Sequence, residues 1–205
     1  MRLINKIAKI LQPQIFSGLE APLESMIDVL IPIAEGCGST SWVLAQYIMH
    51  NYMIARWPEQ AQREVWDVNP DALVSGILIP RLGQGNSVND GIVISGHWPW
   101  VTGISSADWC ILSAMVHKDD KEVECYFLIP TSEVRVIDTW RAIGLKGTGS
   151  HDVVVDKLFV PTYMDSKEGE LERDRLFCLA VLYYLSLENL RDAHELVQLY
   201  RKALI

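Results

Sequence analysis

The sequence has 205 residues and a formal net charge of −8, with 49% hydrophobic and 21% charged residues. This length suffices for one or two small domains with a real core, and the composition is ordinary for a soluble globular protein. The acidic balance argues against nucleic acid as a partner, because phosphates are bound by clustered lysines and arginines. The four cysteines are scattered, without a Cys-x-x-Cys pair, so no metal site or disulfide framework is indicated.

The N-terminus and the apolar runs carry no signal for export or membrane insertion. Residues 1–14 mix basic and apolar residues but lack the long apolar core and the small-residue cleavage site of a secretory signal. The apolar run over residues 26–34 is too short to span a membrane, and Asp28 and Pro32 interrupt it. We therefore expect a cytoplasmic protein with free thiols and no membrane partner.

The first sixty or so residues have the hydrophobic period of helices. Apolar residues over 3–11 share one helical face, and Pro13 stops this helix. A second helix is expected over residues 20–34, and Pro58 lies in the first turn of a short fourth one. The third helix, residues 41–55, is apolar on most sides, which is typical of a buried or interfacial helix. A small domain would leave part of it exposed, so we expect a homo-oligomer or a partner chain.

From about Asn69 the pattern changes to short apolar segments separated by turn residues. The segments are rich in valine, isoleucine and aromatic residues, and Gly, Asn, Asp and Pro lie between them. Because the spacing is too short for crossover helices, we expect antiparallel pairing rather than βαβ units. The predicted strands are residues 74–79, 91–95, 110–116, 123–129, 134–138 and 153–159.

From about residue 167 the helical period returns. The element order predicts an α+β protein in three parts. These are a partial helical N-terminal domain (1–68), a central antiparallel β-barrel or sandwich (69–164) and a short helical C-terminal tail (165–205).

Residues 140–161 combine a glycine-dense turn with an alternating β segment. The three glycines of the turn let the backbone bend tightly and approach a ligand closely. Thr148 and Ser150 add hydroxyls that could bond a polar cofactor group. A purely structural turn has the same composition, so the motif alone leaves both interpretations open.

Four segments, in the same order, resemble the oxygenase component of two-component, flavin-dependent monooxygenases. Members of that family hydroxylate phenols, hydroxyphenylacetate or steroid-derived phenols, and they share the acyl-CoA dehydrogenase fold. The segments cover roughly the first four-fifths of the chain. They are PQIFSGLE with AEGCGSTSWV (13–43), HNYMIARWPEQAQREVW (50–66), SGHWPWVTGISSADW (95–109) and DTWRAIGLKGTGSHDVVVDKLFVP (138–161).

The resemblance implies that the β segment is the middle domain of that fold and that the chain is shortened at both ends. In the family, reduced FMN or FAD lies between the β domain and the helices, where it reacts with oxygen to hydroxylate an aromatic substrate. The cofactor supplies this chemistry, and the protein supplies a dry pocket and orientation. A separate flavin reductase would deliver the cofactor, since the sequence lacks a nicotinamide-binding Gly-x-Gly-x-x-Gly motif.

The resemblance also implies roles for individual residues. His50 matches a family histidine that faces the substrate, where a neutral imidazole could accept a phenol proton; a core histidine is the other interpretation. The segment with Trp98, Thr102 and Gly103 matches W-x-[FW]-x-S-G, a strand beside the flavin ring, although aromatic residues are more often core. Ser75, Thr148 and Ser150 complete the expected cofactor-binding set, and no metal is expected.

The sequence departs from the family pattern at the first of these strands. Family members carry two or three consecutive serines there, and this chain has Ser75-Gly76-Ile77. A degenerate member is therefore the alternative: a binding or assembly module, or an enzyme for a flavin-free reaction in the old pocket. A true acyl-CoA dehydrogenase fits less well, because its catalytic glutamate lies in a C-terminal domain that has no counterpart here.

Overall fold

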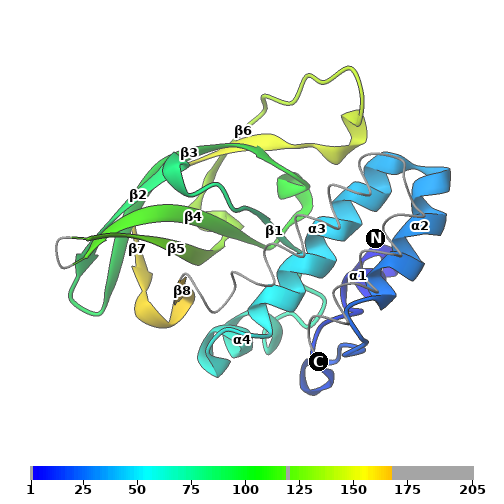
Figure 1. The fold of residues 1–205 in the computed structure, drawn as a ribbon, viewed down its shortest axis with the longest axis horizontal. Helices are drawn as coiled ribbons and strands as arrows, with labels where there is room; N and C mark the ends of the chain where they lie inside the picture. Colours follow the sequence, from blue (N-terminus) through cyan, green and yellow to red (C-terminus); the bar gives the residue numbers. More distant parts are fainter. Residues whose placement is uncertain (1, 119–120, 168–205) are drawn as a thin grey trace.

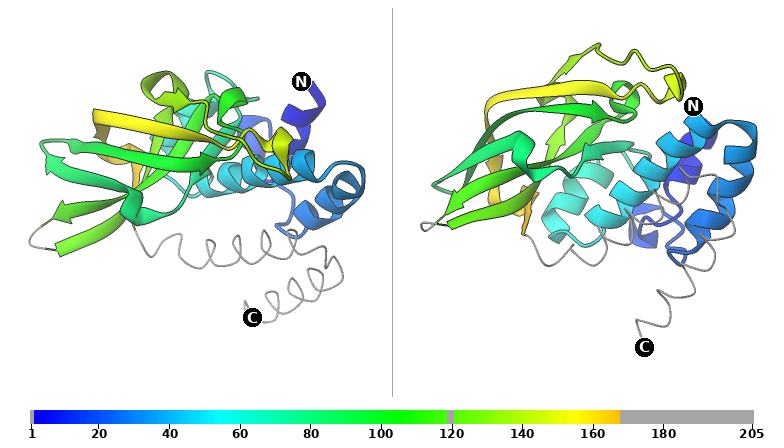
Figure 2. Two further views of the ribbon diagram at one scale, coloured as in Figure 1. Left: turned by 90° about the horizontal axis from the view of Figure 1, so that it is seen from above. Right: turned by 45° about the horizontal axis from the view of Figure 1, so that its top comes forward.

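The computed structural model describes residues 2–118 and 121–167, in which a layer of helices packs against one side of a curled β-sheet (Figure 1). The α+β class is therefore confirmed. Three of the helices lie side by side, and the longest of them contacts both of the others and the first strand of the sheet (Figures 1 and 2). The helices are α1 (Arg2–Ala8), α2 (Ser25–Gly36), α3 (Gly38–Ile54) and α4 (Glu59–Trp66).

The four helices match the predicted ones, with shifted ends. Cys37 has an extended backbone (φ −159°) and separates α2 from α3, as the Gly-Cys-Gly sequence suggests. Most of α3 is buried within the chain itself, against α1, α2 and the first strand. The apolar character of α3 is thus explained by packing inside this chain, and it no longer argues for self-association.

The strands form one sheet in the order β6-β7-β3-β2-β4-β5-β8, with β1 paired to β4 beside this path. All six predicted strands are present. The strands are β1 (Val74–Ile77), β2 (Gly83–Val88), β3 (Gly91–Val101), β4 (Trp109–Lys118), β5 (Lys121–Pro130), β6 (Arg135–Ile137), β7 (His151–Pro161) and β8 (Asp165–Lys167).

The sheet is mixed, so the prediction of a purely antiparallel one was wrong. Both β1 and β2 pair with β4 in parallel, while the other pairings are antiparallel among the residues that the structure describes. The reason is that the chain does not reverse between β1 and β2. A single 3-10 turn, Pro80–Leu82, interrupts a run that continues along β4 in one direction.

Strand β2 was missed because its inward positions are glycines rather than apolar residues. Gly83 and Gly85 are buried and alternate with exposed polar residues. A Cβ at Gly83 would lie 2.2 Å from Cζ2 of Trp98, and one at Gly85 would lie 2.9 Å from Cγ2 of Ile92. Large side chains from β3 thus occupy the space that β2 leaves free, and hydrophobic periodicity cannot reveal such a strand.

The predicted helical tail is not confirmed. Its first residues form β8, which pairs with β5, and residues 168–205 lie outside the described part of the chain. The three predicted domain ranges remain predictions. No described helix has the length and apolarity that crossing a membrane requires.

Candidate functional site

Five of the predicted site residues meet where the sheet faces the N-terminal half of α3. Thr102 and Gly103 directly follow β3, Thr148 and Ser150 end the loop that precedes β7, and Ser75 lies on β1. The Oγ of Ser150 is 3.0 Å from Oγ1 of Thr102 and 2.8 Å from Oγ1 of Thr148. The Ser75 hydroxyl donates to the backbone carbonyl of Thr102 at 2.5 Å. We call these four hydroxyl side chains the hydroxyl network.

The hydroxyl network joins the helical layer to the loop between β6 and β7. At one end, Nε1 of Trp42 on α3 donates to Oγ1 of Thr102 at 3.3 Å. At the other, Oγ1 of Thr148 donates to the carbonyl of Leu145 at 3.0 Å. All four hydroxyls are buried and satisfied by protein partners, as buried polar groups usually are. The hydroxyl network therefore fixes the end of β3 relative to α3 and to the β6–β7 loop.

Gly103 turns the chain in a left-handed conformation, which favours glycine over other residues. Its φ is +73°, and an added Cβ would lie 2.6 Å from the hydroxyl oxygen of Tyr47 on α3. The Tyr47 hydroxyl donates to the Gly103 carbonyl at 2.7 Å, and the Gly103 N–H donates to the Thr148 carbonyl at 2.9 Å. Burial, with a contribution from Asp108, raises the pKa of Tyr47 well above its usual value, so this tyrosine remains a neutral donor.

His50 lies on α3 and is 2% exposed. Its Nδ1 is 3.1 Å from the Val74 carbonyl, and because a carbonyl only accepts, Nδ1 carries the proton. Burial lowers the pKa of His50 to about 4, and the hydrogen bond to Val74 offsets this only in part. His50 is therefore a neutral imidazole whose Nε2 has a lone pair. That nitrogen faces Gly76, where an added Cβ would lie 2.9 Å away.

The two tryptophans of β3 have opposite environments. Trp98 is 0% exposed, and its Nε1 donates to the Ser113 carbonyl at 2.8 Å. Trp100 is 62% exposed and has a φ of +63°, in the left-handed region that bulky residues rarely occupy. The pairing of β3 with β7 is interrupted between Trp98 and Val101, so a bulge turns Trp100 outward. Trp98 thus lies in the core, and Trp100 presents the free aromatic face.

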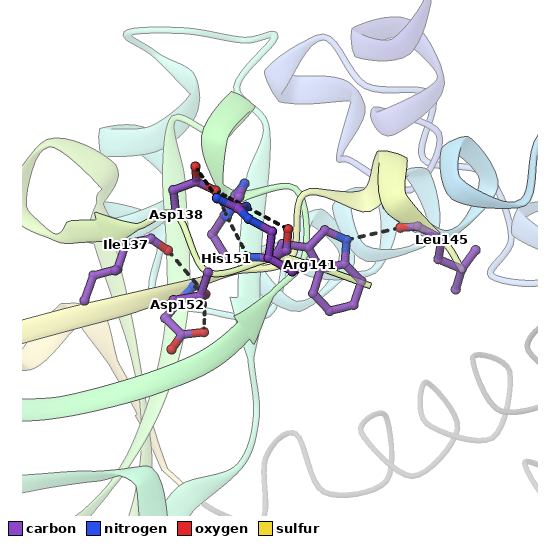
Figure 3. A network of polar contacts seen from close by, with 8 residues as sticks. Ile137, Asp138, Arg141, Leu145, His151 and Asp152 are labelled. Atoms are coloured by element: carbon purple, nitrogen blue, oxygen red, sulfur yellow. Dashed lines mark hydrogen bonds and ion pairs between the residues drawn. The ribbon is translucent and has the colours of Figure 1, made fainter. Parts of the chain in front are cut away.

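Polar contacts fasten the loop between β6 and β7 to the sheet (Figure 3). The Asp138 carboxylate lies 2.8 Å from Nη1 of Arg141 and 3.2 Å from Nδ1 of His151. These interactions lower the pKa of Asp138, the Arg141 hydrogen bond contributing most. Asp152 holds the neighbouring turn through the Thr139 hydroxyl at 2.8 Å. The glycine-dense segment is therefore a fastened loop.

Sequence reasoning missed Trp42, Tyr47, Trp100 and Asp152. The first two lie on α3, in a helix where apolar periodicity hides individual polar contacts. Trp100 stands in the matched W-x-[FW]-x-S-G segment, but strand alternation gives it the same side as Trp98. The partners of Asp152 lie in two distant parts of the chain, β3 and the β6–β7 loop, so the local sequence does not indicate these contacts.

No protein-family model matches the chain, but individual proteins do. It is 38% identical over 156 residues to the flavin-dependent monooxygenase, oxygenase subunit HsaA, of Rhodococcus jostii, which covers 76% of this chain and 41% of that protein. It is 31% identical over 185 residues to the FADH2-dependent resorcinol hydroxylase, oxygenase component, of a Rhizobium species, with 87% of this chain and 45% of that protein covered.

A solved structure supports the same relationship. XiaF from a Streptomyces species, in complex with FADH2 and glycerol, matches with a TM-score of 0.76 and 32% identity, over 84% of this chain and 43% of XiaF. The chain therefore spans less than half the length of the relatives it matches. Sequence and fold agree over this shared part. By both criteria, the homologues of this chain are oxygenase components of flavin-dependent monooxygenases, and the chain is shorter than they are.

Proposed function

We propose that this chain forms the flavin-facing and substrate-facing part of an oxygenase component that hydroxylates an aromatic compound with reduced FMN or FAD. The observation that carries the proposal is the exposed Trp100, held in a left-handed backbone two residues before the hydroxyl network begins at Thr102. Strained backbone and an exposed large aromatic residue are costly, and both concentrate at ligand sites.

The described residues fit a flavin. An isoalloxazine ring is flat and apolar on its faces and polar along its edges. The Trp100 indole offers a flat apolar surface, and the Thr102 hydroxyl, which has two protein partners, has capacity for a third hydrogen bond to the polar edge. Thr102 is supported on two sides: the Ser75 hydroxyl donates to its backbone carbonyl, and the Ser150 hydroxyl, itself bonded to Thr148, contacts its hydroxyl. Trp98 supports the strand from within the core.

When bound, reduced flavin supplies the reaction with oxygen. The protein would supply a base for the substrate. Since His50 is neutral and its Nδ1–H is engaged, Nε2 is the atom that could accept a phenol proton or orient the ring oxygen. A side chain at Gly76 would crowd this nitrogen, because its Cβ would lie 2.9 Å from Nε2. A separate flavin reductase is the partner that this chemistry needs, and self-association stays a prediction.

The test is anaerobic titration of the full chain with reduced FMN and reduced FAD, followed by turnover with a flavin reductase, phenolic substrates and ¹⁸O₂. We expect micromolar binding of at least one flavin and ¹⁸O in the hydroxylated product. Binding of neither flavin would refute the proposal and leave the degenerate, flavin-free alternative.

A further inference from the structure

The carboxylate of Asp152 contacts two separate segments, the loop after β6 and strand β3. It accepts from the Thr139 hydroxyl at 2.8 Å and from Nε2 of His97, on β3, at 2.7 Å. It also lies opposite Trp100, because its neighbours Val153 and His151 pair with Trp98 and Val101, and the Trp100 backbone N–H helps to lower its pKa. Burial alone would raise the pKa of Asp152, but the three hydrogen bonds lower it overall, so the group is a carboxylate at neutral pH. Its side chain is only 14% exposed, which shields these contacts from water.

Trp100 needs such a contact to keep its conformation. A left-handed backbone costs a bulky residue roughly 1–2 kcal/mol, and a side chain that is 62% exposed gains little from packing. The ladder between β3 and β7 is interrupted at this residue, since pairing stops at Trp98 and resumes at Val101. Asp152 lies directly opposite this gap, so its carboxylate is placed to hold the Trp100 N–H where the ladder has no bond.

The same carboxylate also fixes the start of the loop. The backbone N–H of Asp152 donates to Oγ1 of Thr139 at 3.1 Å while that hydroxyl donates back to the carboxylate. His97 must carry its proton on Nε2, because a carboxylate only accepts. Thus Asp152 ties together the Trp100 backbone, an exposed histidine and the loop that ends at Thr148 and Ser150.

We propose that Asp152 is a positioning residue for the flavin site: it holds Trp100 in the outward, left-handed conformation that presents the indole to the cofactor. This inference rests on the proposed function. Asp138 provides the matched control, since its carboxylate lies in the same loop region and contacts Arg141 and His151.

The first experiment observes Trp100 without any cofactor. The full chain is labelled with 5-fluorotryptophan, and W100F assigns one of the seven ¹⁹F resonances. In D152N and in T139V, which removes the Thr139 hydroxyl that bonds both the carboxylate and the backbone N–H of Asp152, we expect the Trp100 resonance to shift toward that of free fluorotryptophan. The Trp98 resonance should stay in place, and D138N should change neither. An unmoved Trp100 resonance in D152N would overturn the inference.

The second experiment measures reduced-flavin affinity in a double-mutant cycle of W100A and D152N. We expect about a tenfold loss for D152N, the size of one hydrogen bond to a charged group, and no further loss when D152N is added to W100A. Additive losses would show that Asp152 acts elsewhere and would overturn the inference. If W100A binds flavin normally, the proposed function fails at Trp100, while the ¹⁹F spectra still decide whether Asp152 holds it.

Discussion

Trp98 and Trp100 are two residues apart on one strand, yet Trp98 is buried in the core and Trp100 is exposed at the end of the sheet. Regular alternation would give both side chains the same face. The bulge between Trp98 and Val101 breaks that alternation and turns Trp100 outward. A single irregularity thus converts a core position into a candidate ligand surface. A change of side-chain volume at Trp98 would cost stability, because the interior is closely packed. Around Trp100, the structure consists of bonded hydroxyl groups and one exposed aromatic ring.

The largest expected effect separates the two tryptophans. W98A should destabilise the fold by about 3–5 kcal/mol, because it removes a fully buried aromatic side chain and leaves a cavity. W100A should change stability by less than about 1 kcal/mol, since most of its side chain is already in water. Urea denaturation of both variants measures this difference, and equal losses would mean that Trp100 is a core residue.

The buried face of α3 should respond to pH through His50. Its folded pKa of about 4 lies below the unfolded value of 6.5, so protons bind the unfolded state preferentially between these values. His50 therefore contributes fully to the free energy of unfolding above pH 6.5. As the pH falls toward 4, about 3 kcal/mol of that free energy is lost. Urea denaturation from pH 7 to 4 should show this slope for the wild type, and H50Q should flatten it. H50Q with an unchanged slope would assign the effect to other groups.

Where the end of β3 contacts α3, G103A should lower the free energy of unfolding by about 1–3 kcal/mol. The added methyl group would meet the Tyr47 hydroxyl at 2.6 Å, and the positive φ disfavours any side chain. G144A is the control. Gly144 lies in the β6–β7 loop, and a Cβ added there would have no atom within 4 Å. Thermal melting of both variants makes the comparison, and similar melting temperatures would contradict the proposed contact.

The smallest effect concerns the hydroxyl network. T102V should weaken reduced-flavin binding by about 0.5–1.5 kcal/mol, the usual contribution of one neutral hydrogen bond. H50A should instead spare flavin binding and lower hydroxylation, since its proposed role is toward the substrate. Anaerobic titration and product analysis separate the two. If neither variant alters binding or turnover, both residues serve the fold alone.

Much of the fold could be read from hydrophobic period, because α3 and the apolar strands follow it closely. Within the hydroxyl network, Thr148 and Ser150 were noted in the glycine-dense motif itself, whereas Thr102 and Ser75 came from the resemblance. Trp98 was taken from the matched family segment, and strand alternation could not separate it from Trp100, because no residue near them indicates a bulge. The β2 strand was hidden for the opposite reason, since its glycines make room for Trp98 and carry no apolar signal of their own.

The hydrogen bonds that run from Trp42 and Tyr47 to the end of β3 bear on how the chain unfolds. They connect α3 to the sheet at buried positions, and His50 adds a third link through the Val74 carbonyl. Separating the helices from the sheet would break these three hydrogen bonds together and would expose the apolar surfaces around them. We therefore expect helix layer and sheet to melt as one cooperative unit, with amides of α3 and β3 exchanging hydrogen at the same global free energy.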